Sequence, residues 1–92
     1  MLTSHQLDAA ACASLTTRLK SIEGQARGIQ RMLDENRECT EILDQLAALR
    51  AASHAATMQA LESFALRCLR ESPEEPEAMM AQMLSVISRL TR

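Results

Sequence analysis

The stretch CTEILDQLAALRAASHAATMQALESFALRCL, residues 39–69, decides the fold of this 92-residue chain. It contains neither Gly nor Pro, and its leucines recur at helical spacing, which predicts one long helix. Cys39 and Cys68 lie near its two ends, 29 residues apart. At about 100° and about 1.5 Å per residue, both cysteines fall on one face of the helix but about 43 Å apart. The two sulfur atoms of one chain therefore cannot meet.

A second copy of the same helix can bring the cysteines together. In an antiparallel pair that crosses between Ser53 and His54, Cys39 of each chain lies beside Cys68 of the other. The crossing region is rich in small residues, which lets two helices approach closely: Ala47, Ala48, Ala51, Ala52, Ser53, Ala55, Ala56 and Ala60. The sequence therefore predicts a dimer with two inter-chain dithiol sites.

The composition predicts a single domain with a thin apolar core, because the chain has one Phe, no Trp and no Tyr. Small helical domains of this kind gain stability by forming oligomers. The net charge of −2 is distributed in blocks: residues 1–33 carry four basic and two acidic side chains, whereas residues 34–49 carry one basic and five acidic ones. A basic face can therefore exist on an acidic protein.

The sequence also limits the class of protein. No apolar run approaches the roughly 20 residues of a membrane span, and the N-terminus shows no secretory signal. Three cysteines outside a small secreted framework indicate reactive or metal-binding thiols, so we expect a cytoplasmic protein. A thiol oxidoreductase needs a close Cys-x-x-Cys pair or a base beside its nucleophile, and the chain has neither. We therefore expect neither an enzyme nor a bound cofactor.

The chain is expected to divide into two parts. Residues 1–13, which include His5 and Cys12, show little pattern and are expected to form a flexible segment, whereas residues 14–92 form the helical domain. A first helix is predicted from about Ser14 to about Asp34. Its apolar seam repeats in steps of four and three: Leu15, Leu19, Ile22, Ala26, Ile29 and Leu33.

A basic stripe of Lys20, Arg27 and Arg31 lies away from this seam. It is either an ordinary solvated face or a face that binds anions. Gly24 and Gly28 cost about 1 kcal/mol each in a helix interior. Close approach of another backbone or of a phosphate can offset this cost.

A polar turn at residues 34–38 follows, and Asn36 suits the left-handed conformation that ends a helix. A short turn of this type predicts an antiparallel helical hairpin. Cys39 then falls in the first turn of the long helix, where the backbone N–H groups favour negative charge. That helix is predicted to continue to about Glu71, with Cys68 between Arg67 and Arg70. The two cysteines are either reactive thiols or buried structural residues.

Residues 72–77 are predicted to end the long helix and to open a third one, with Ser72 and Glu75 as a capping box. Its apolar stripe consists of Met80, Met83, Leu84, Ile87 and Leu90, and methionines at this spacing favour core packing over metal binding. His54 is interpreted as a packed or solvated side chain, because about 21 Å of helix separates it from either cysteine. The predicted fold is all-α, with three helices and a long central one.

Three segments together resemble the CsoR/RcnR family of bacterial repressors: RLKSIEGQARGIQRML (residues 18–33), RECTEIL (37–43) and QLAALRAA (45–52). The resemblance extends over roughly residues 14–90 and implies a helical dimer that pairs into a tetramer. It also implies a repressor that a small inducer releases from operator DNA. The matching positions make five basic residues candidate DNA contacts: Arg18, Lys20, Arg27, Arg31 and Arg50.

Subclasses of this family differ in the potential ligands that lie near the two cysteine positions. Copper(I) members carry a histidine four residues before it, where this chain has Phe64, and a phenyl ring cannot bind metal. Nickel and cobalt members need histidines that are absent here, and formaldehyde sensors pair the first cysteine with an N-terminal amine. Two cysteines without the histidine are similar to the CstR group, which responds to persulfides.

This resemblance implies an inducer of the reactive-sulfur class and no metal. Cys39 and Cys68 of the partner chain would form a di- to tetrasulfide bridge, and the bridged dimer would release DNA. Two alternatives stay open. One is a copper(I)-responsive repressor that uses the same two cysteines, with His5 or Cys12 as an added ligand. The other is a purely structural helical oligomer.

Overall fold

The structure, a computed structural model, describes residues 8–71 and 76–90 except for the side chains of Cys68, Glu71, Pro76 and Met79. It contains the helices α1 (Ala9–Asp34), α2 (Cys39–Glu71) and α3 (Pro76–Leu90). No strand occurs in these ranges, and the all-α prediction with a long central helix is confirmed.

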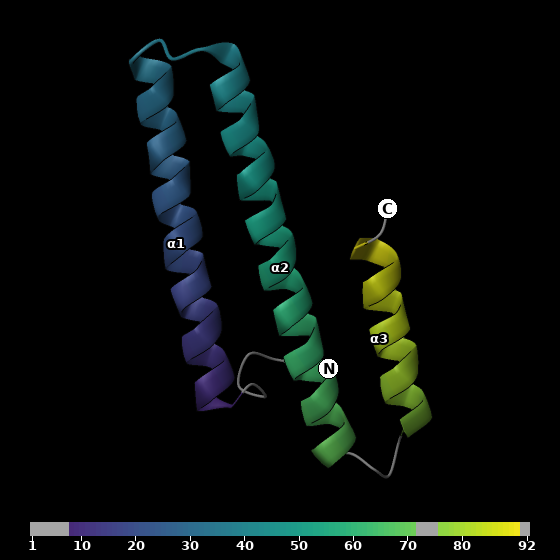
Figure 1. The fold of residues 1–92 in the computed structure, drawn as a ribbon. Coiled ribbons are helices and arrows are strands. Elements are labelled where there is room, and N and C mark those ends of the chain that lie inside the picture. Colours follow the sequence, from purple (N-terminus) through teal and green to yellow (C-terminus); the bar gives the residue numbers. More distant parts are fainter. Residues whose placement is uncertain (1–7, 72–75, 91–92) are drawn as a thin grey trace.

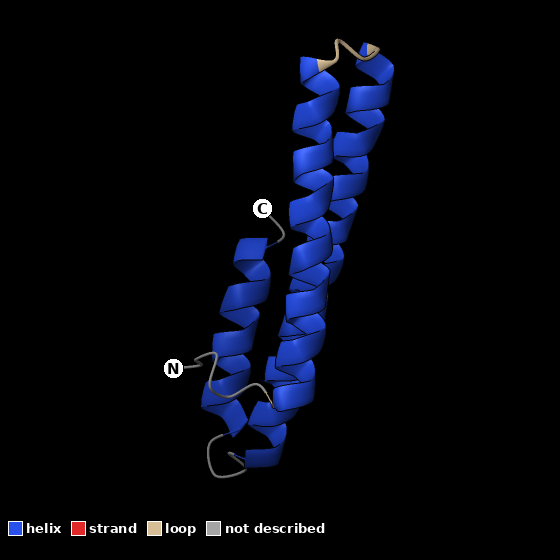
Figure 2. Cartoon of the chain, turned by 90° about the vertical axis from the view of Figure 1, so that its left-hand side faces the viewer, coloured by secondary structure: helices blue, strands red, loops and turns tan. Residues whose placement is uncertain are grey.

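The three helices form an elongated molecule of 57 × 29 × 14 Å. α1 and α2 run antiparallel and side by side, and α3 lies beside the C-terminal half of α2 (Figure 1). Figure 2 shows the same arrangement from the side, with the α1–α2 hairpin extending well beyond α3. The predicted helical hairpin is therefore confirmed.

α1 begins earlier than the sequence indicated. Asp8 is its N-cap, and the Asp8 carboxylate accepts a hydrogen bond of 2.7 Å from the backbone N–H of Ala11. The alanines that follow are strong helix formers, so the cap extends the helix back to Ala9 despite the missing apolar pattern. The prediction of a flexible segment over residues 1–13 and a start near Ser14 is therefore wrong for residues 9–13, and residues 1–7 lie outside the described part.

The turn between α1 and α2 is built around Asn36, as predicted. Its φ of 55° is left-handed. The backbone N–H of Arg37 donates to the carbonyl of Met32 at 3.0 Å, and the N–H of Asn36 donates to Leu33 at 3.2 Å. This pair of bonds is the Schellman pattern that terminates a helix. α2 then starts at Cys39, and the carbonyl of Glu38 accepts the N–H groups of Glu41 and Ile42.

The core of the protomer is thin. Among the described residues, the buried apolar side chains are Ile29 of α1, Ala56 of α2 and Met83 of α3. The predicted seam of α1 is covered only in part, because Leu19 and Leu33 are exposed. A hairpin covers one side of each helix, so it leaves part of a wide apolar stripe open. The large exposed apolar side chains are Leu19, Leu33, Leu43, Leu46, Met58, Leu66, Leu69, Met80, Leu84, Ile87 and Leu90.

Two further expectations from the sequence concern the start of α3 and the possibility of a membrane span. The predicted capping box of Ser72 and Glu75 lies outside the described residues, and α3 is described from Pro76 onward. In the described part of the chain, each helix is too short or too polar to cross a membrane.

Candidate functional site

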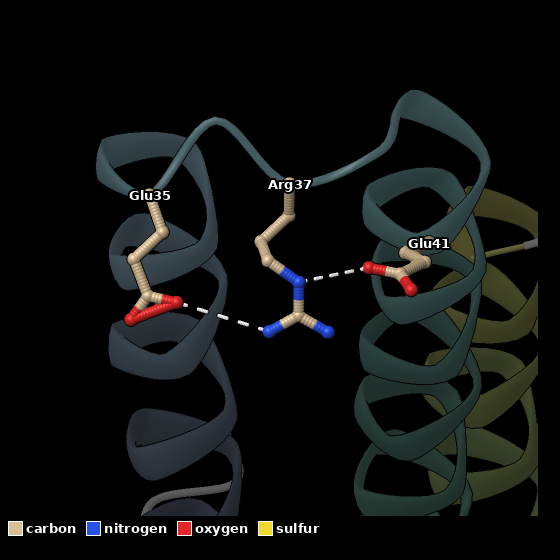
Figure 3. A network of polar contacts seen from close by, with 3 residues as sticks. All are labelled: Glu35, Arg37 and Glu41. Carbon is tan, nitrogen blue, oxygen red and sulfur yellow. Dashed lines mark hydrogen bonds and ion pairs between the residues drawn. The ribbon is translucent and has the colours of Figure 1, made fainter.

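Cys39 occupies the first position of α2, at the tip of the hairpin. A charged network holds the turn beside it (Figure 3). The Arg37 guanidinium bonds to the Glu41 carboxylate at 2.9 Å and approaches the Glu35 carboxylate at 3.8 Å. Cys39 lies between Arg37 and Glu41 in the sequence, so this network joins the residues on either side of the cysteine. Its thiol is free and exposed, and can be reached by an inducer or a second chain.

Cys68 belongs to the same uninterrupted helix, three residues before its end at Glu71. Its side chain lies outside the described part of the structure. Because α2 is continuous from Cys39 to Glu71, the two cysteines are separated by about 43 Å of helix axis. A bridge between Cys39 and Cys68 therefore requires two protomers.

Phe64 lies one turn before Cys68 and is half-buried. It lines a largely apolar cavity of about 370 Å³ between α2 and α3, together with Leu61, Met83 and Val86. The ring therefore also contributes to packing between these helices. A phenyl group offers no lone pair to a metal at this position.

The five candidate DNA contacts are all exposed: Arg18, Lys20, Arg27, Arg31 and Arg50. The helical positions of Lys20, Arg27 and Arg31 place them together on the side of α1 opposite the apolar seam. Arg18 is nine residues from Arg27, which corresponds to half a turn around the helix axis. The single helix α1 therefore presents three of its four basic candidates on one face and Arg18 on another.

Glu23, Gly24 and Gly28 lie close in sequence to the basic residues of α1. Arg27 pairs with Glu23 one turn earlier, at 3.4 Å, and both side chains are well exposed. Such a surface pair is weak and leaves the guanidinium available for a phosphate. A Cβ added at Gly24 or Gly28 meets nothing within 4 Å. No close contact in the described protomer therefore accounts for the glycines.

The additional ligand candidates are dispersed. Cys12 is free and exposed in the first turns of α1, and His54 is exposed in the middle of α2. His5 lies outside the described residues. Within the described part of one protomer, no group of three His, Cys, Asp or Glu side chains is placed to hold a metal ion. A metal site that includes Cys39 must draw ligands from elsewhere.

The structure adds two features that the sequence did not predict, both where α1 begins beside the end of α2. Gln59 Nε2 donates a hydrogen bond of 2.8 Å to Ser14 Oγ, while the buried Gln59 Oε1 has no partner among the described residues. A small cavity of about 160 Å³ also opens here, lined by Asp8, Ala11, Ser63, Leu66, Arg67 and Arg70. Both depend on contacts between residues at least 45 positions apart, and no local motif signals them.

Comparison with known proteins assigns the chain to a family. A family model described as metal-sensitive transcriptional repressor matches residues 12–89. The copper-sensing transcriptional repressor CsoR of Bacillus subtilis (strain 168) is 43% identical over 58 residues, which are 63% of this chain and 57% of that protein. The copper-sensing transcriptional repressor RicR of Mycobacterium tuberculosis is 35% identical over 52 residues, 56% of this chain and 54% of RicR. The chain thus spans little more than half the length of these curated relatives.

A solved structure extends the likeness over the whole chain. The crystal structure of the copper-sensing repressor CsoR with Cu(I) from Geobacillus thermodenitrificans NG80-2 superposes with a TM-score of 0.84 at 33% sequence identity. The match covers 100% of this chain and 95% of the other. The relatives are transcriptional repressors and not enzymes, in agreement with the sequence analysis. The chain therefore belongs to the metal-sensitive transcriptional repressor family, the group to which its CsoR/RcnR-like motifs pointed.

Proposed function

We propose that this protein is a DNA-binding repressor that Cu(I) releases from its operator. Cu(I) would bind between Cys39 of one protomer and Cys68 of the partner subunit. The observation that carries the proposal is the free, exposed Cys39 at the start of a continuous helix that also contains Cys68. The copper sensors among the relatives support Cu(I) as the inducer. Copper therefore takes precedence over the reactive sulfur that the sequence analysis favoured.

The donor set suits this ion. Thiolates are soft ligands and favour Cu(I), and two of them suffice for a linear site. An antiparallel pair of α2 helices would form two such sites per dimer, one at each end. Metal binding at both ends would favour one relative orientation of the protomers, and release of DNA follows if that orientation fits the operator less well. The response is therefore a shift in the shape of the dimer.

The basic face of α1 is the proposed DNA contact. Lys20, Arg27 and Arg31 are exposed on one side of the helix, where they can meet phosphates. Arg50 of α2 and Arg18 of α1 would contribute from other faces, which requires that the assembled oligomer bring several copies to one DNA duplex. Binding through phosphates should depend strongly on salt concentration.

The test is a DNA-release assay under anaerobic conditions. The full-length protein is bound to a fluorescent fragment of its own promoter region and titrated with Cu(I). Wild-type protein and the control Cys12→Ala should release DNA with one Cu(I) per pair of Cys39 and Cys68. Cys39→Ala and Cys68→Ala should still bind DNA but no longer respond. Normal Cu(I) release by Cys68→Ala would contradict the proposed site.

A second candidate inducer is reactive sulfur, which Phe64 favours. In the copper members that this chain resembles, a histidine stands at the position of Phe64, so the chain lacks that ligand. Cys39 would take a sulfur atom from a persulfide donor, which leaves as a thiol. Cys68 of the partner subunit would then attack the new persulfide and displace hydrosulfide, which leaves a disulfide between the chains. Two persulfidated cysteines would give a trisulfide in the same way.

Mass spectrometry separates the two inducers. If reactive sulfur is the inducer, treatment with a polysulfide donor should give chains cross-linked by a disulfide or by a bridge with one or more added sulfur atoms. Phe64→His should strengthen Cu(I) binding, whereas it should leave sulfur cross-linking largely unchanged. Release of DNA by Cu(I) at one equivalent, without cross-linked chains after polysulfide treatment, would exclude the sulfur mechanism.

A further inference from the structure

We propose that His54 and Met58 form a second metal site, without cysteine, for a soft monovalent cation such as Cu(I) or its analogue Ag(I). Both side chains come from the middle of α2 and line one cavity against the last turn of α3. The inference does not rest on the proposed function, because it involves neither Cys39 nor Cys68. It follows from the spacing of the two residues, from the lining of the cavity and from the position of the cavity beside α3.

The spacing of the two residues suits the binding of one ion. His54 and Met58 lie four residues apart in a continuous helix, so they share one face, with Cβ atoms about 5–6 Å apart. Two histidines with this spacing bind a single zinc ion in helical metal sites. The methionine side chain is unbranched and has three rotatable bonds, so its sulfur can adjust to an ion that His54 holds. The pair can therefore supply two donors to the same ion.

Both side chains are accessible to an ion from solvent. His54 is exposed, and Met58 is 46% exposed. Within the part of the chain that the structure describes, neither side chain takes part in a hydrogen bond or an ion pair. An ion that binds to the pair therefore displaces no polar contact between described residues.

The lining of the cavity favours a soft ion over a hard one. The cavity has a volume of about 230 Å³, and its other lining residues are Thr57, Leu61, Ile87 and Leu90. None of these described side chains carries a carboxylate, whereas Ca²⁺ and Mg²⁺ need several oxygen ligands. Thioether sulfur favours Cu(I), and imidazole also suits copper. The donor set therefore selects a cation of the Cu(I) class.

The position of the cavity favours positive charge. Ile87 and Leu90 belong to the last turn of α3, and Figure 1 shows this end of α3 beside the middle of α2. The carbonyl groups at the C-terminal end of a helix carry partial negative charge, which stabilises a nearby cation. Arg89, the basic residue of the same turn, is not among the residues that line the cavity. The end of α3 therefore adds to the attraction for the ion without adding a ligand.

The test uses the full-length protein with its three cysteines replaced by alanine, after circular dichroism has shown that it is helical. Under anaerobic conditions, in competition with a chelator, this variant should bind one Cu(I) per chain. Its X-ray absorption spectrum should require both a nitrogen and a sulfur ligand. The further substitution His54→Ala or Met58→Leu should lower the Cu(I) affinity at least about tenfold, since even outer-shell partners of a metal contribute that much. Met80→Leu, at an exposed methionine of α3 outside the cavity, is the matched control and should leave the affinity unchanged.

A second measurement uses the wild-type protein, so the outcome does not depend on the folding of the cysteine-free variant. The methionine methyl groups are labelled with ¹³C and observed by NMR during a titration with Ag(I). After the thiols are saturated, the Met58 signal should shift, whereas the Met80 signal should stay in place. Met58→Leu and Met80→Leu identify the two signals. If the cysteine-free variant is not helical, this titration decides the question.

Three results would overturn the inference. The first is a helical cysteine-free variant that does not bind Cu(I), or a Met58 signal that Ag(I) does not shift. The second is an unchanged Cu(I) affinity in His54→Ala or Met58→Leu. The third is an equal loss in Met80→Leu, which would indicate general binding by exposed methionines. Because the cysteine-free variant lacks the proposed inducer site, its failure to bind Cu(I) would leave the proposed function standing.

Discussion

Asn36 determines where α1 ends, because its φ of 55° turns the chain out of the helix. A side chain with a Cβ resists this conformation, whereas glycine does not, and Asn adopts it more readily than most residues. We expect Asn36→Ala to lower the free energy of unfolding by about 1 kcal/mol and Asn36→Gly to change it by less than about 0.5 kcal/mol. Urea unfolding at one fixed protein concentration provides the comparison. Equal effects of the two substitutions would show that the turn tolerates another conformation.

For the two glycines of α1, in contrast to Asn36, we expect a substitution by alanine to increase the free energy of unfolding. The described structure shows no contact within 4 Å for an added Cβ at either position. Gly24→Ala and Gly28→Ala should therefore raise the free energy of unfolding by up to about 1 kcal/mol each, through helix propensity. If DNA approaches this face, the same substitutions should weaken operator binding. Thermal unfolding and a gel-shift titration of each variant measure the two effects, and higher stability with unchanged DNA affinity would place the glycines outside the DNA contact.

Features of single residues that depend on neighbouring residues in the sequence were mostly predictable. The left-handed Asn36 and the placement of Cys39 in the first turn of α2 are confirmed. The cap at Asp8 was missed because the alanines after it show no apolar period. The bond between Ser14 and Gln59 was missed because it depends on the alignment of two helices. The roles of Cys39 and Cys68 as sensing thiols stay predictions.

α1 is the element whose charge distribution can be tested directly. Each guanidinium that contacts a phosphate contributes about one unit to the slope of log K against log salt concentration. Arg27→Ala and Arg31→Ala should each reduce the slope of operator binding by about one. Arg89→Ala, which removes an exposed arginine from α3, is the control and should leave the slope unchanged. A constant slope in the α1 variants would exclude this face as the phosphate contact.

The boundaries of the elements were predictable to different degrees. α2 matches the prediction at both ends, because it contains no Gly or Pro and follows a clear turn signal. α1 begins at Ala9 and not near Ser14, since a cap and helix propensity can extend a helix beyond its apolar seam. The placement of α3 against α2 was not predictable. Its apolar stripe suits any apolar surface, and only the folded arrangement puts Met83 and Val86 beside Phe64.

The described protomer exposes many large apolar side chains. Leu43 and Leu69 of α2 are 60% and 67% exposed, near its two ends. A small helical domain with so thin a core is expected to gain stability from association. We therefore expect the midpoint of thermal unfolding to rise with protein concentration, as it does when association stabilises the native state. Calorimetry over a hundredfold range of concentration is the measurement.

Two variants define the surface that stabilises the assembly. Leu43→Glu should lower the unfolding midpoint and the molecular mass in solution, because a charge would replace apolar surface in the expected interface. Leu90→Glu, at the end of α3, should have a smaller effect if α2 forms the main contact. An unfolding midpoint that is independent of concentration would instead indicate a protomer that folds alone.

The length of α2 has a genetic consequence. Because 29 residues of continuous helix separate the two cysteines of a chain, each inducer site of the proposed kind would be shared by two copies of the chain. A strain that expresses a Cys39→Ala allele together with a Cys68→Ala allele would assemble mixed dimers. In these, one end would have both thiols and the other end none. Two alleles that fail separately would thus complement each other and restore one of the two sites in each mixed dimer, an outcome that a sensor contained within one polypeptide cannot produce.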